Sequence, residues 1–273
     1  MNLKKIYKVG VFLPVYNQEF CIERVIKSIL DQDYKDVFIY IGDDCSTDKS
    51  FDIICDYSKK FKNIRSYRNN TNLGVIKNCN KLLDFIEEDS EIDLLCFTAG
   101  DDIMLPGKIS KQVGIFDKHK VNYVLHDYKV LDLINEKELG EKKHKNQGLC
   151  NLRETISNGL PTITCMINYK KLGKLRYLNS KSGTDLYLHW KYILSTGANT
   201  YFIPEILLIY GRAAHNVNAS SFDKNSIIGK NLKLRRDNAV TIFKLFCEYP
   251  TYLFFRFYIN SFLYYLKGYF QKR

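Results

Sequence analysis

Two pairs of adjacent aspartates are the residues of this chain best suited to chemistry. Asp43 and Asp44 follow one apolar run, and Asp101 and Asp102 follow another. A single turn of this kind is explained by helix capping, because Asp and Ser side chains accept from the free N–H groups of the next helix. If both pairs lie at the same edge of a sheet, however, they concentrate negative charge there, which is costly unless a cation binds. Because hard divalent cations bind carboxylates together with phosphates, the pattern favours a nucleotide site with a divalent cation, Mn²⁺ or Mg²⁺.

The spacing of apolar residues predicts the elements that would position these turns. Short apolar runs bounded by Pro, Gly and Asp predict buried strands, at 9–14, 37–41, 64–67 and 94–98. Helical spacing of apolar residues predicts helices between them, around 21–30, 51–55 and 75–86. Strands and helices in alternation predict an α/β fold with a parallel sheet wound in βαβ units. Ligands of such sheets bind beyond the carboxyl ends of the strands, where the two aspartate pairs and the turn at 14–17 lie.

Beyond about residue 120 the alternation of strands and helices breaks down. Further strands are predicted at 123–127, 129–134, 162–168 and 204–210, and helices near Leu152 and at 185–194. The polar, lysine-rich stretch 135–147 is typical of a mobile loop.

The composition is that of a folded protein with a basic C-terminal tail. Of the 273 residues, 45% are hydrophobic and 26% are charged, which excludes a disordered or collagen-like chain. The formal net charge is +11, and residues 230–273 contribute +7 of it, with nine Lys or Arg and two acids. Thirteen Phe or Tyr lie between residues 243 and 270. The longest largely apolar run of the tail, 252–266, has 15 residues, fewer than the roughly 20 of a membrane-spanning helix.

A basic, aromatic-rich helix suits two places. It fits the interface of an anionic membrane, where Tyr and Phe reach headgroup depth and Lys and Arg meet phosphates. Alternatively, it packs its aromatic side chains onto the rest of the protein or onto a dimer partner. We therefore divide the chain into a domain at 1–222 and a basic, aromatic-rich helical tail at 223–273, and favour membrane-surface binding for the tail.

The order and spacing of three segments carry a family resemblance. The segments are 9–50, which contains PVYN and GDDCSTD, 69–80 (NNTNLGVIKNCN) and 99–109 (AGDDIMLPGKI). Together they resemble the family-2 glycosyltransferases, over roughly residues 8–220 of the chain. The resemblance implies the GT-A fold, a Rossmann-like, mostly parallel sheet flanked by helices, here with a C-terminal helical appendage.

The resemblance also implies roles for individual residues. The turn after the first strand would hold the base of the donor, and Asp44 would accept from a uracil N–H. Asp101 would lie near the ribose, and Asp102 would bind the metal ion that bridges the two phosphates. The donor-binding residues implied in this way are Pro14, Tyr16, Asn17, Asp44, Asn72, Asp101 and Arg212. The residue chemistry agrees, since an aromatic ring stacks on a base and a carboxylate binds a cation.

Asp185 and His215, in the second half of the chain, each have two interpretations. Asp185 stands where a helix is predicted to begin, so composition alone makes it an N-cap. The resemblance instead makes Asp185 the base that deprotonates the acceptor hydroxyl. On composition His215 is a surface-loop histidine, whereas the resemblance to a family motif that closes over the diphosphate makes it a metal ligand near Arg212.

These assignments predict a metal-dependent, inverting glycosyltransferase of the bacterial cell-surface polysaccharide type. A nucleotide-sugar half at about 1–120 would bind a UDP-sugar, and an acceptor half at about 121–222 would bind a lipid-linked or cell-surface glycan. The expected location is the cytoplasm, at the inner face of the cytoplasmic membrane. The N-terminal apolar run, interrupted by Pro14, predicts a strand and not a signal peptide. Eight cysteines without a C-x-x-C pair indicate neither a zinc site nor a redox motif.

Three other functions stay open. A nucleotidyltransferase of the same architecture would consume a nucleoside triphosphate, although the chain lacks the Gly- and Lys-rich loop that grips one. A basic module that binds nucleic acid or membrane without catalysis would suit the net charge. The positive charge is concentrated in an aromatic tail and the predicted site is acidic, so no nucleic-acid partner is expected. The third is a binding protein that keeps the fold without catalysis.

Overall fold

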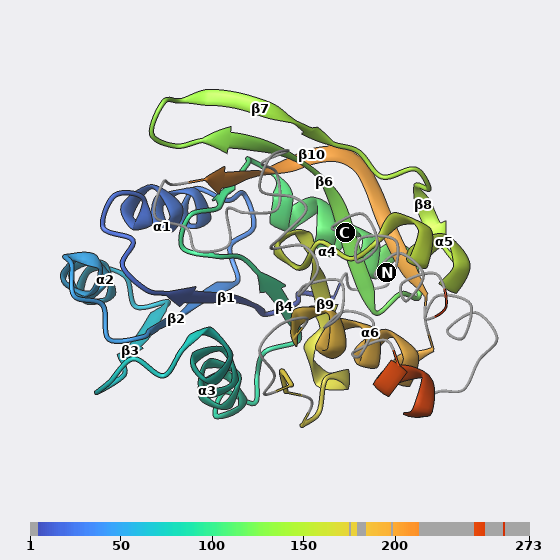
Figure 1. Cartoon of the computed structure of the whole chain (residues 1–273), viewed down its shortest axis with the longest axis horizontal. Coiled ribbons are helices and arrows are strands. Elements are labelled where there is room, and N and C mark those ends of the chain that lie inside the picture. Colours follow the sequence, from blue (N-terminus) through green and yellow to red (C-terminus); the bar gives the residue numbers. More distant parts are fainter. Residues whose placement is uncertain are drawn as a thin grey trace, which may run out of the picture.

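The computed structural model describes residues 5–174, 176–178, 184–197, 199–212, 243–248 and 259, and for 184–186 the backbone alone. Its strands form one mixed sheet between two layers of helices (Figure 1). The strands are β1 (Val9–Val15), β2 (Val37–Asp43), β3 (Ile64–Arg68), β4 (Leu94–Phe97), β5 (Ile103–Met104), β6 (Tyr123–Asp132), β7 (Lys137–Lys142), β8 (Gly148–Cys150), β9 (Met166–Asn168) and β10 (Thr200–Arg212). The helices are α1 (Ile22–Leu30), α2 (Ser50–Lys60), α3 (Val75–Glu87), α4 (Lys108–Lys118), α5 (Leu152–Asn158) and α6 (Thr184–Thr196), with 3-10 turns η1 (Thr162–Thr164) and η2 (Tyr169–Lys171).

The first half of the chain forms the parallel part of the sheet. The strand order is β3-β2-β1-β4-β9-β6-β10-β5, with β7 beside β6 and β8 beside β10. β1 pairs in parallel with β2 and β4, and β2 pairs in parallel with β3. Val15 pairs with Asp43, so β1 and β2 end at the same level and the turns that follow them meet. The predicted βαβ winding is confirmed, and the strands and helices predicted for this half are present.

The second half continues the sheet with both strand directions. β9 is antiparallel to β4 and to β6, while β10 is parallel to β6. β6 and β10 therefore run in the same direction as β4, and their carboxyl ends lie at the same edge as those of β1 and β2. This edge is where ligands of α/β sheets bind.

Several predictions for the second half were wrong. One continuous strand, β6, occupies the stretch predicted as two, because it pairs with β10 from Tyr123 to Asp132. The predicted mobile loop 135–147 contains β7, whose six residues are all exposed and pair with β6 through the backbone. An exposed strand of polar residues has no apolar alternation, so its sequence carries no strand signal. The predicted strand at 162–168 is extended only in β9, because η1 occupies its start.

Helix α4 was not predicted, and its buried face explains why. Lys108 and Gln112 lie on that face, fully buried among Ile109, Val113 and Phe116. Two polar residues in the apolar stripe hide the helical period on which the prediction depends. The two-residue β5 and three-residue β8 are too short to give a periodic signal.

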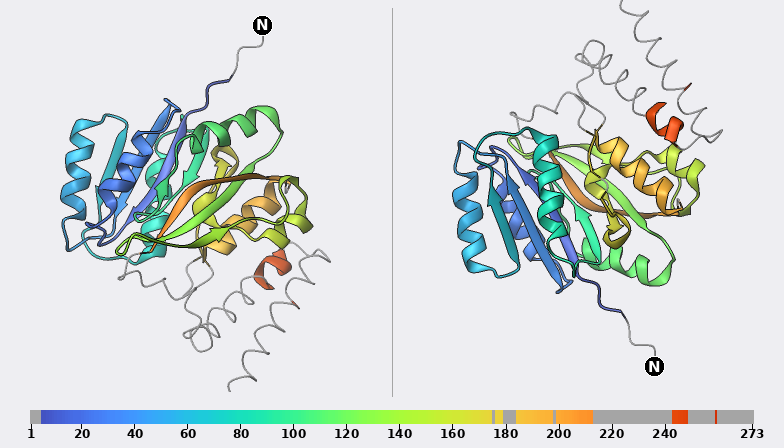
Figure 2. Two further views of the ribbon diagram at one scale, coloured as in Figure 1. Left: turned by 90° about the horizontal axis from the view of Figure 1, so that it is seen from above. Right: turned by 90° about the horizontal axis from the view of Figure 1, so that it is seen from below.

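Helices lie on both faces of the sheet (Figure 2), and an apolar core lies between the sheet and each layer of helices. One core packs α1, α2 and α4 on the sheet, with Ile26, Ile54 and Val113 among its members. The other packs α3 and α6 on the opposite face, with Leu83 and Trp190 among its members. Five of the eight cysteines are buried, as expected of small core residues, and no disulfide joins any of the eight.

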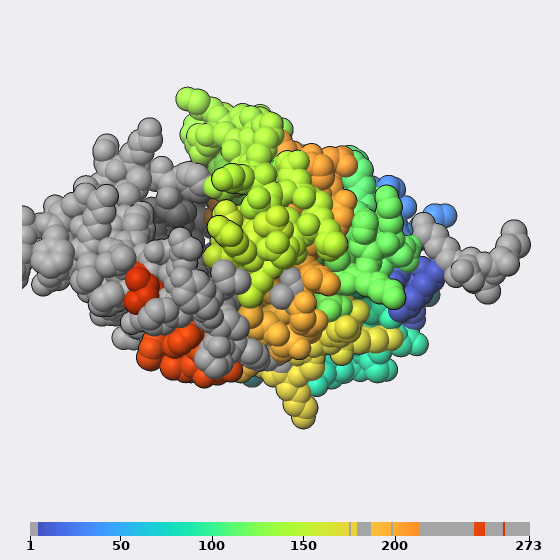
Figure 3. Space-filling model, turned by 90° about the vertical axis from the view of Figure 1, so that its right-hand side faces the viewer, coloured from blue at the N-terminus to red at the C-terminus, as the bar shows by residue number. Residues whose placement is uncertain are grey.

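A helical segment at 243–248 packs against α6. Leu245 is fully buried in the core of that face, and Phe246 packs on it. Glu248 accepts from the Tyr187 hydroxyl at 2.6 Å and lies 2.8 Å from the Lys191 ammonium. Figure 3 shows the segment, in red, on the face that also carries α5. For this segment the structure supports the packing interpretation of the tail, and the rest of 223–273 apart from Ile259 lies outside the described residues.

Within the part of the chain that the structure describes, none of the helices has the length and apolar character needed to cross a bilayer. The run 252–266, whose length argued against a span, lies outside that part apart from Ile259.

His189, on α6, has a fully buried imidazole ring. Its Nδ1 lies 2.6 Å from the Tyr123 hydroxyl, and its ring meets Phe97 edge to face at 4.9 Å. Burial lowers the pKa of His189 to about 3, because the interior disfavours the charged ring. Burial also lowers the pKa of His126 and His144.

Acidification is therefore expected to destabilise the fold through His189. The unfolded chain takes up a proton on this ring below about pH 6.5, whereas the folded chain excludes it, so stability falls as the pH drops through 6.5 towards 3. His189 alone would contribute at most ~1.4 kcal/mol per pH unit. Denaturant unfolding between pH 5 and 7.5 measures this slope, and His189→Gln should flatten it. Equal slopes for the two proteins would contradict the assignment.

Candidate functional site

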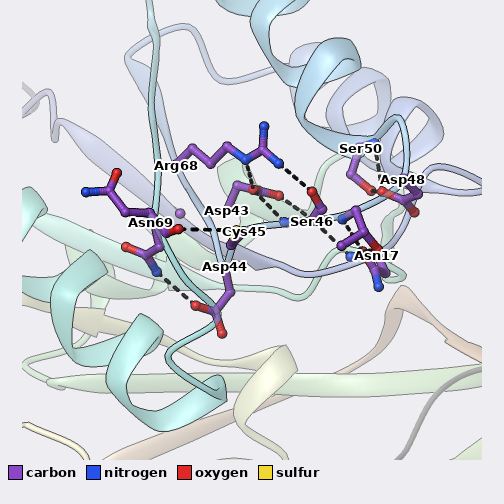
Figure 4. Close-up of polar contacts among 12 residues, drawn as sticks. Asn17, Asp43, Asp44, Cys45, Ser46, Asp48, Ser50, Arg68 and Asn69 are labelled. Atoms are coloured by element: carbon purple, nitrogen blue, oxygen red, sulfur yellow. Dashed lines mark hydrogen bonds and ion pairs between the residues drawn. The ribbon is translucent and has the colours of Figure 1, made fainter.

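The turn after β2 is built by Asp43. Its carboxylate is fully buried and accepts from the Ser46 backbone N–H at 3.0 Å and from the Ser46 hydroxyl. The Arg68 guanidinium lies 3.5 Å from the same carboxylate and donates to the Ser46 carbonyl at 2.6 Å. Figure 4 shows these contacts. Asp43 is thus committed to the shape of the turn, which leaves Asp44 as the carboxylate of the pair that faces the neighbouring loop.

The turn after β1 is tied to the same structure through Asn17. Asn17 has a φ of 51°, a left-handed conformation that Asn tolerates better than most residues. Its N–H donates to the Ser46 hydroxyl at 3.0 Å, and its side-chain carbonyl accepts from the Thr47 N–H at 2.8 Å. Pro14 lies within β1 opposite Gly42, and Tyr16 is 44% exposed at the edge of the sheet. The predicted donor-binding residues of this turn are therefore close together, with the Tyr16 ring accessible.

Asp44 fixes the loop that leads into α3. Its Oδ1 accepts from the Asn69 amide at 2.9 Å and the Leu73 N–H at 2.8 Å, and its Oδ2 accepts from the Gly74 N–H at 2.8 Å. Asn72, also predicted to bind the donor, is exposed in this loop, and its side chain accepts from the same Gly74 N–H at 2.9 Å. A carboxylate has about four acceptor positions, so the three donors leave one on Oδ2. That position is the one with which Asp44 can accept from a base.

Asp102 is a buried carboxylate that is only half satisfied. It is fully buried, and its Oδ1 accepts from the Gly211 N–H at 3.3 Å. Its Oδ2 has no hydrogen-bond partner among the residues that the structure describes. Burial, together with the neighbouring charge of Asp101, raises the pKa of Asp102 well above its usual value. A buried carboxylate of this kind calls for a cation, because unpaired charge in the interior is costly.

The residues fit a divalent cation that takes most of its ligands from the phosphates of the donor and from water. A free carboxylate oxygen is a ligand that Mg²⁺ and Mn²⁺ prefer. No group of three or more His, Cys, Asp or Glu able to hold a metal occurs within the described ranges. Asp102 is the buried carboxylate of those ranges that has an oxygen without a hydrogen-bond partner. His215, the second predicted ligand, lies outside those ranges.

Lys108 is a buried cation near Asp102 that the sequence analysis missed. Its Nζ lies 2.9 Å from Cys96 Sγ and 2.9 Å from the Gln112 side-chain oxygen. Its charge acts on Asp102 in the opposite sense to burial and lowers the pKa of that carboxyl. A lysine directly after the Pro-Gly turn was its one sequence signal, and nothing in the pattern distinguished it from a surface lysine.

β10 approaches the Asp101-Asp102 turn so closely that only glycine fits. A Cβ on Gly211 would overlap the carbonyl group of Asp101 and would lie 2.6 Å from the Leu133 side chain. Arg212, the next residue, ends β10, and its carbonyl accepts from the Leu133 N–H at 3.0 Å. Arg212 is therefore on the strand that contacts Asp102, and its donor role stays a prediction.

Gly211→Ala is expected to destabilise the protein by about 1–3 kcal/mol, because the added methyl group forces β10 away from the turn. The same movement would withdraw the Gly211 N–H from Asp102. Gly114→Ala is the matched control, since a Cβ at Gly114 in α4 meets no atom within 4 Å. Denaturant unfolding of both variants tests the prediction, and equal effects would show that the close approach is not rigid.

Asp185 is the second residue of α6, so the predicted helix does begin at this point. Its side chain lies outside the described part of the structure, and its role stays a prediction.

Comparison with known proteins places this geometry in a family. Putative glycosyltransferase EpsE of Bacillus subtilis is 32% identical over 114 residues, which is 41% of this chain and 40% of EpsE. The putative teichuronic acid biosynthesis glycosyltransferase TuaG of the same organism is 26% identical over 217 residues, or 78% of this chain and 82% of TuaG.

Solved structures share the fold. S. aureus TarS 1-349 in complex with UDP-GlcNAc superposes with a TM-score of 0.69 at 21% identity, over 86% of this chain and 66% of that one. The mannosyltransferase PcManGT from Pyrobaculum calidifontis, in complex with GDP-Man and Mn²⁺, superposes with a TM-score of 0.65 at 14% identity, over 94% of this chain and 69% of that one. The expected GT-A-like α/β fold is thus confirmed. Residues 10–175 match Glycosyl transferase family 2, and the chain belongs to that family.

Proposed function

We propose that this protein is a metal-dependent, inverting glycosyltransferase that moves a sugar from a UDP-sugar to a hydroxyl of a lipid-linked or cell-surface glycan. The observation that carries the proposal is the half-satisfied, buried carboxylate of Asp102 at the same sheet edge as the turns after β1 and β2. TarS, which shares the fold, is described with UDP-GlcNAc. TuaG and EpsE, which are similar in sequence, are described as glycosyltransferases.

The order of the strands suggests how the donor lies. The turns after β2 and β1 would hold the base, with Tyr16 stacking on it and Asp44 accepting from its N–H. The turn after β4, two strands from β2, would hold the ribose and diphosphate through Asp101 and Asp102. Arg212 and His215 would contact the diphosphate from the other side, since a guanidinium matches the geometry of phosphate oxygens. Residues 1–120 would thus form the nucleotide-sugar half.

The acceptor half, 121–222, would supply the base. Asp185 at the start of α6 would take the proton of the acceptor hydroxyl, and this needs hydrogen-bond reach and an ionised carboxylate at the working pH. Attack of that hydroxyl on the anomeric carbon, with departure of the nucleoside diphosphate from the opposite side, inverts the configuration. A bound Mn²⁺ or Mg²⁺ would neutralise charge on the departing diphosphate.

The tail supports a location at the inner face of the cytoplasmic membrane. Its positive charge and aromatic residues suit an anionic lipid surface, while the segment 243–248 is packed on α6. Such attachment would bring the acceptor half to lipid-linked glycans.

A thermal-shift panel tests the proposal. UDP, GDP, CMP and dTDP are added with and without Mn²⁺ to the wild type, to Asp102→Ala and to the control Glu205→Ala, which alters an exposed residue of β10. A ligand that binds the folded state raises the melting temperature by mass action. We expect UDP to stabilise the wild type and the control only with Mn²⁺, and Asp102→Ala not at all.

Two results would overturn the proposal. If none of the nucleotides stabilises the protein, the proposed nucleotide-sugar donor is wrong. If UDP stabilises it equally with and without Mn²⁺, the proposed metal dependence is wrong. Release of pyrophosphate from a nucleoside triphosphate would instead identify a nucleotidyltransferase.

A further inference from the structure

Two tyrosines stand side by side on the strands that extend past the end of β4. Tyr128 lies in the middle of β6 and Tyr210 near the end of β10, with ring centroids 6.2 Å apart and ring planes at 77°. Tyr210 pairs with Val130 across the parallel strands. Because side chains alternate along a strand, Tyr128 and Val130 share a face of the sheet, and Tyr210 lies on that face too.

The pair lies next to Asp102. Gly211, whose N–H reaches the Asp102 carboxylate at 3.3 Å, directly follows Tyr210. β5, which begins at the residue after Asp102, pairs with β10 through Ile103 and Ile209. Burial and then the charge of Asp102 raise the pKa of Tyr128, and burial with the charges of Asp102 and Asp101 raises the pKa of Tyr210 to about 12. Both phenols therefore keep their protons at neutral pH and can donate hydrogen bonds.

Both side chains are half-buried, and neither hydroxyl makes a hydrogen bond to the part of the protein that the structure describes. Neither is among its buried polar atoms without a partner, so both hydroxyls are accessible. The tyrosines buried deeper in the fold behave differently. The hydroxyl of Tyr40 donates to Asp89 at 2.6 Å and that of Tyr192 to the Asn168 carbonyl at 2.8 Å. Two accessible phenol hydroxyls beside a candidate site, without a partner among the described residues, are available to a ligand.

We propose that Tyr128 and Tyr210 bind the sugar ring of the donor and determine which sugar is accepted. This inference rests on the proposed function. Along the sheet edge the order is β2, β1, β4, β9, β6 and β10, so a donor with its base at β2 and β1 and its diphosphate at β4 has its sugar directed towards β6 and β10. A tyrosine pair offers a sugar what it needs, namely an aromatic face for its C–H groups and hydroxyls for its own hydroxyl groups.

Calorimetric titration with UDP alone and with UDP-sugars separates a role in binding the sugar from a role in binding the nucleotide. The wild type, Tyr128→Phe and Tyr210→Phe are titrated with UDP, UDP-glucose, UDP-galactose, UDP-GlcNAc and UDP-GalNAc in the presence of Mn²⁺. Loss of one hydrogen bond should weaken the preferred UDP-sugar by about 3- to 20-fold and leave the affinity for UDP within about twofold. The ranking of the four sugars should also change in at least one variant.

Tyr201→Phe is the matched control, because Tyr201 lies on β10 at its far end, against the His119 ring at 4.9 Å. It should leave the affinities for all five ligands unchanged. Unaltered UDP-sugar affinity in both site variants, or an equal loss for UDP and UDP-sugar, would overturn the inference while the proposed function stands. A wild type that binds neither UDP nor any UDP-sugar would overturn the proposed function itself.

Discussion

Replacing Asp102 with Asn is expected to lower the kcat of sugar transfer by about 10³-fold or more and, at the same time, to raise the stability of the protein. The activity falls because Oδ2 of Asp102 is the buried carboxylate oxygen left for a cation in the described structure, and a metal that neutralises a leaving group is worth several kcal/mol. An amide oxygen is a weaker ligand and carries no charge.

The stability gain follows from the pKa of the same group. Burial and Asp101 raise the pKa of Asp102 in the folded protein, so the folded state holds the proton more tightly than the unfolded chain. Ionisation therefore costs stability, and the cost begins as the pH rises past the unfolded value near 3.9 and grows until the folded pKa is reached. The advantage of Asp102→Asn should be small at pH 4 and largest at neutral pH.

Transfer assays and denaturant unfolding at pH 4, 5.5 and 7.5 check both parts. Asp132→Asn is the control, since Asp132 is a half-buried aspartate at the end of β6 whose pKa is lowered, chiefly by the hydrogen bond from the Asn135 side chain, so its replacement should show the opposite pH dependence. An advantage that is independent of pH would show that folding does not raise the pKa of Asp102, and normal transfer would show that Asp102 is not part of the catalytic site.

Asp185→Asn is expected to reduce transfer by about 10²- to 10⁴-fold and to leave donor affinity within about twofold, which is the range of a lost general base. The residue is the second of α6, in the acceptor half, so the turns that would hold the nucleotide stay unchanged. Single-turnover transfer and calorimetric titration with UDP measure the two quantities separately.

Glu154→Gln is a suitable control for Asp185→Asn. Glu154 is also an acid in the first turn of a helix, where it completes a capping box with Asn151. Its replacement should change stability slightly and transfer not at all. If Asp185→Asn behaves in the same way, Asp185 only stabilises the first turn of α6 and the base lies elsewhere.

The sequence predicted the first half of the fold well because its strands are buried on both faces and its helices have clear apolar stripes. β7 was not predicted, because its residues are all exposed and only backbone pairing with β6 makes it a strand. α4 was not predicted for the opposite reason, because Lys108 and Gln112 are polar residues on its buried face.

The candidate site was predictable in its positions and not in its contacts. The sequence shows that Asp44 and Asp102 each follow a predicted strand of the parallel sheet, and the fold brings them to one edge on either side of β1. That Asp44 holds the loop at 69–74, while Asp102 keeps one oxygen without a protein partner in the described structure, depends on how that loop and β10 pack. Tyr128 and Tyr210 enter the site only because β6 and β10 pair, which no local pattern indicates.

The packing of 243–248 on α6 has a consequence for how this protein can be divided. Leu245 fills a place in the same core as Trp190, and Glu248 is bound to Tyr187 and Lys191 on the helix that begins next to Asp185. A chain cut after residue 222 would leave that place empty and two polar groups of α6 without their partner. The segment 243–248 is therefore a structural part of the domain that contains α6, and a recombinant protein or an exchange of tails between relatives should keep these residues with that domain.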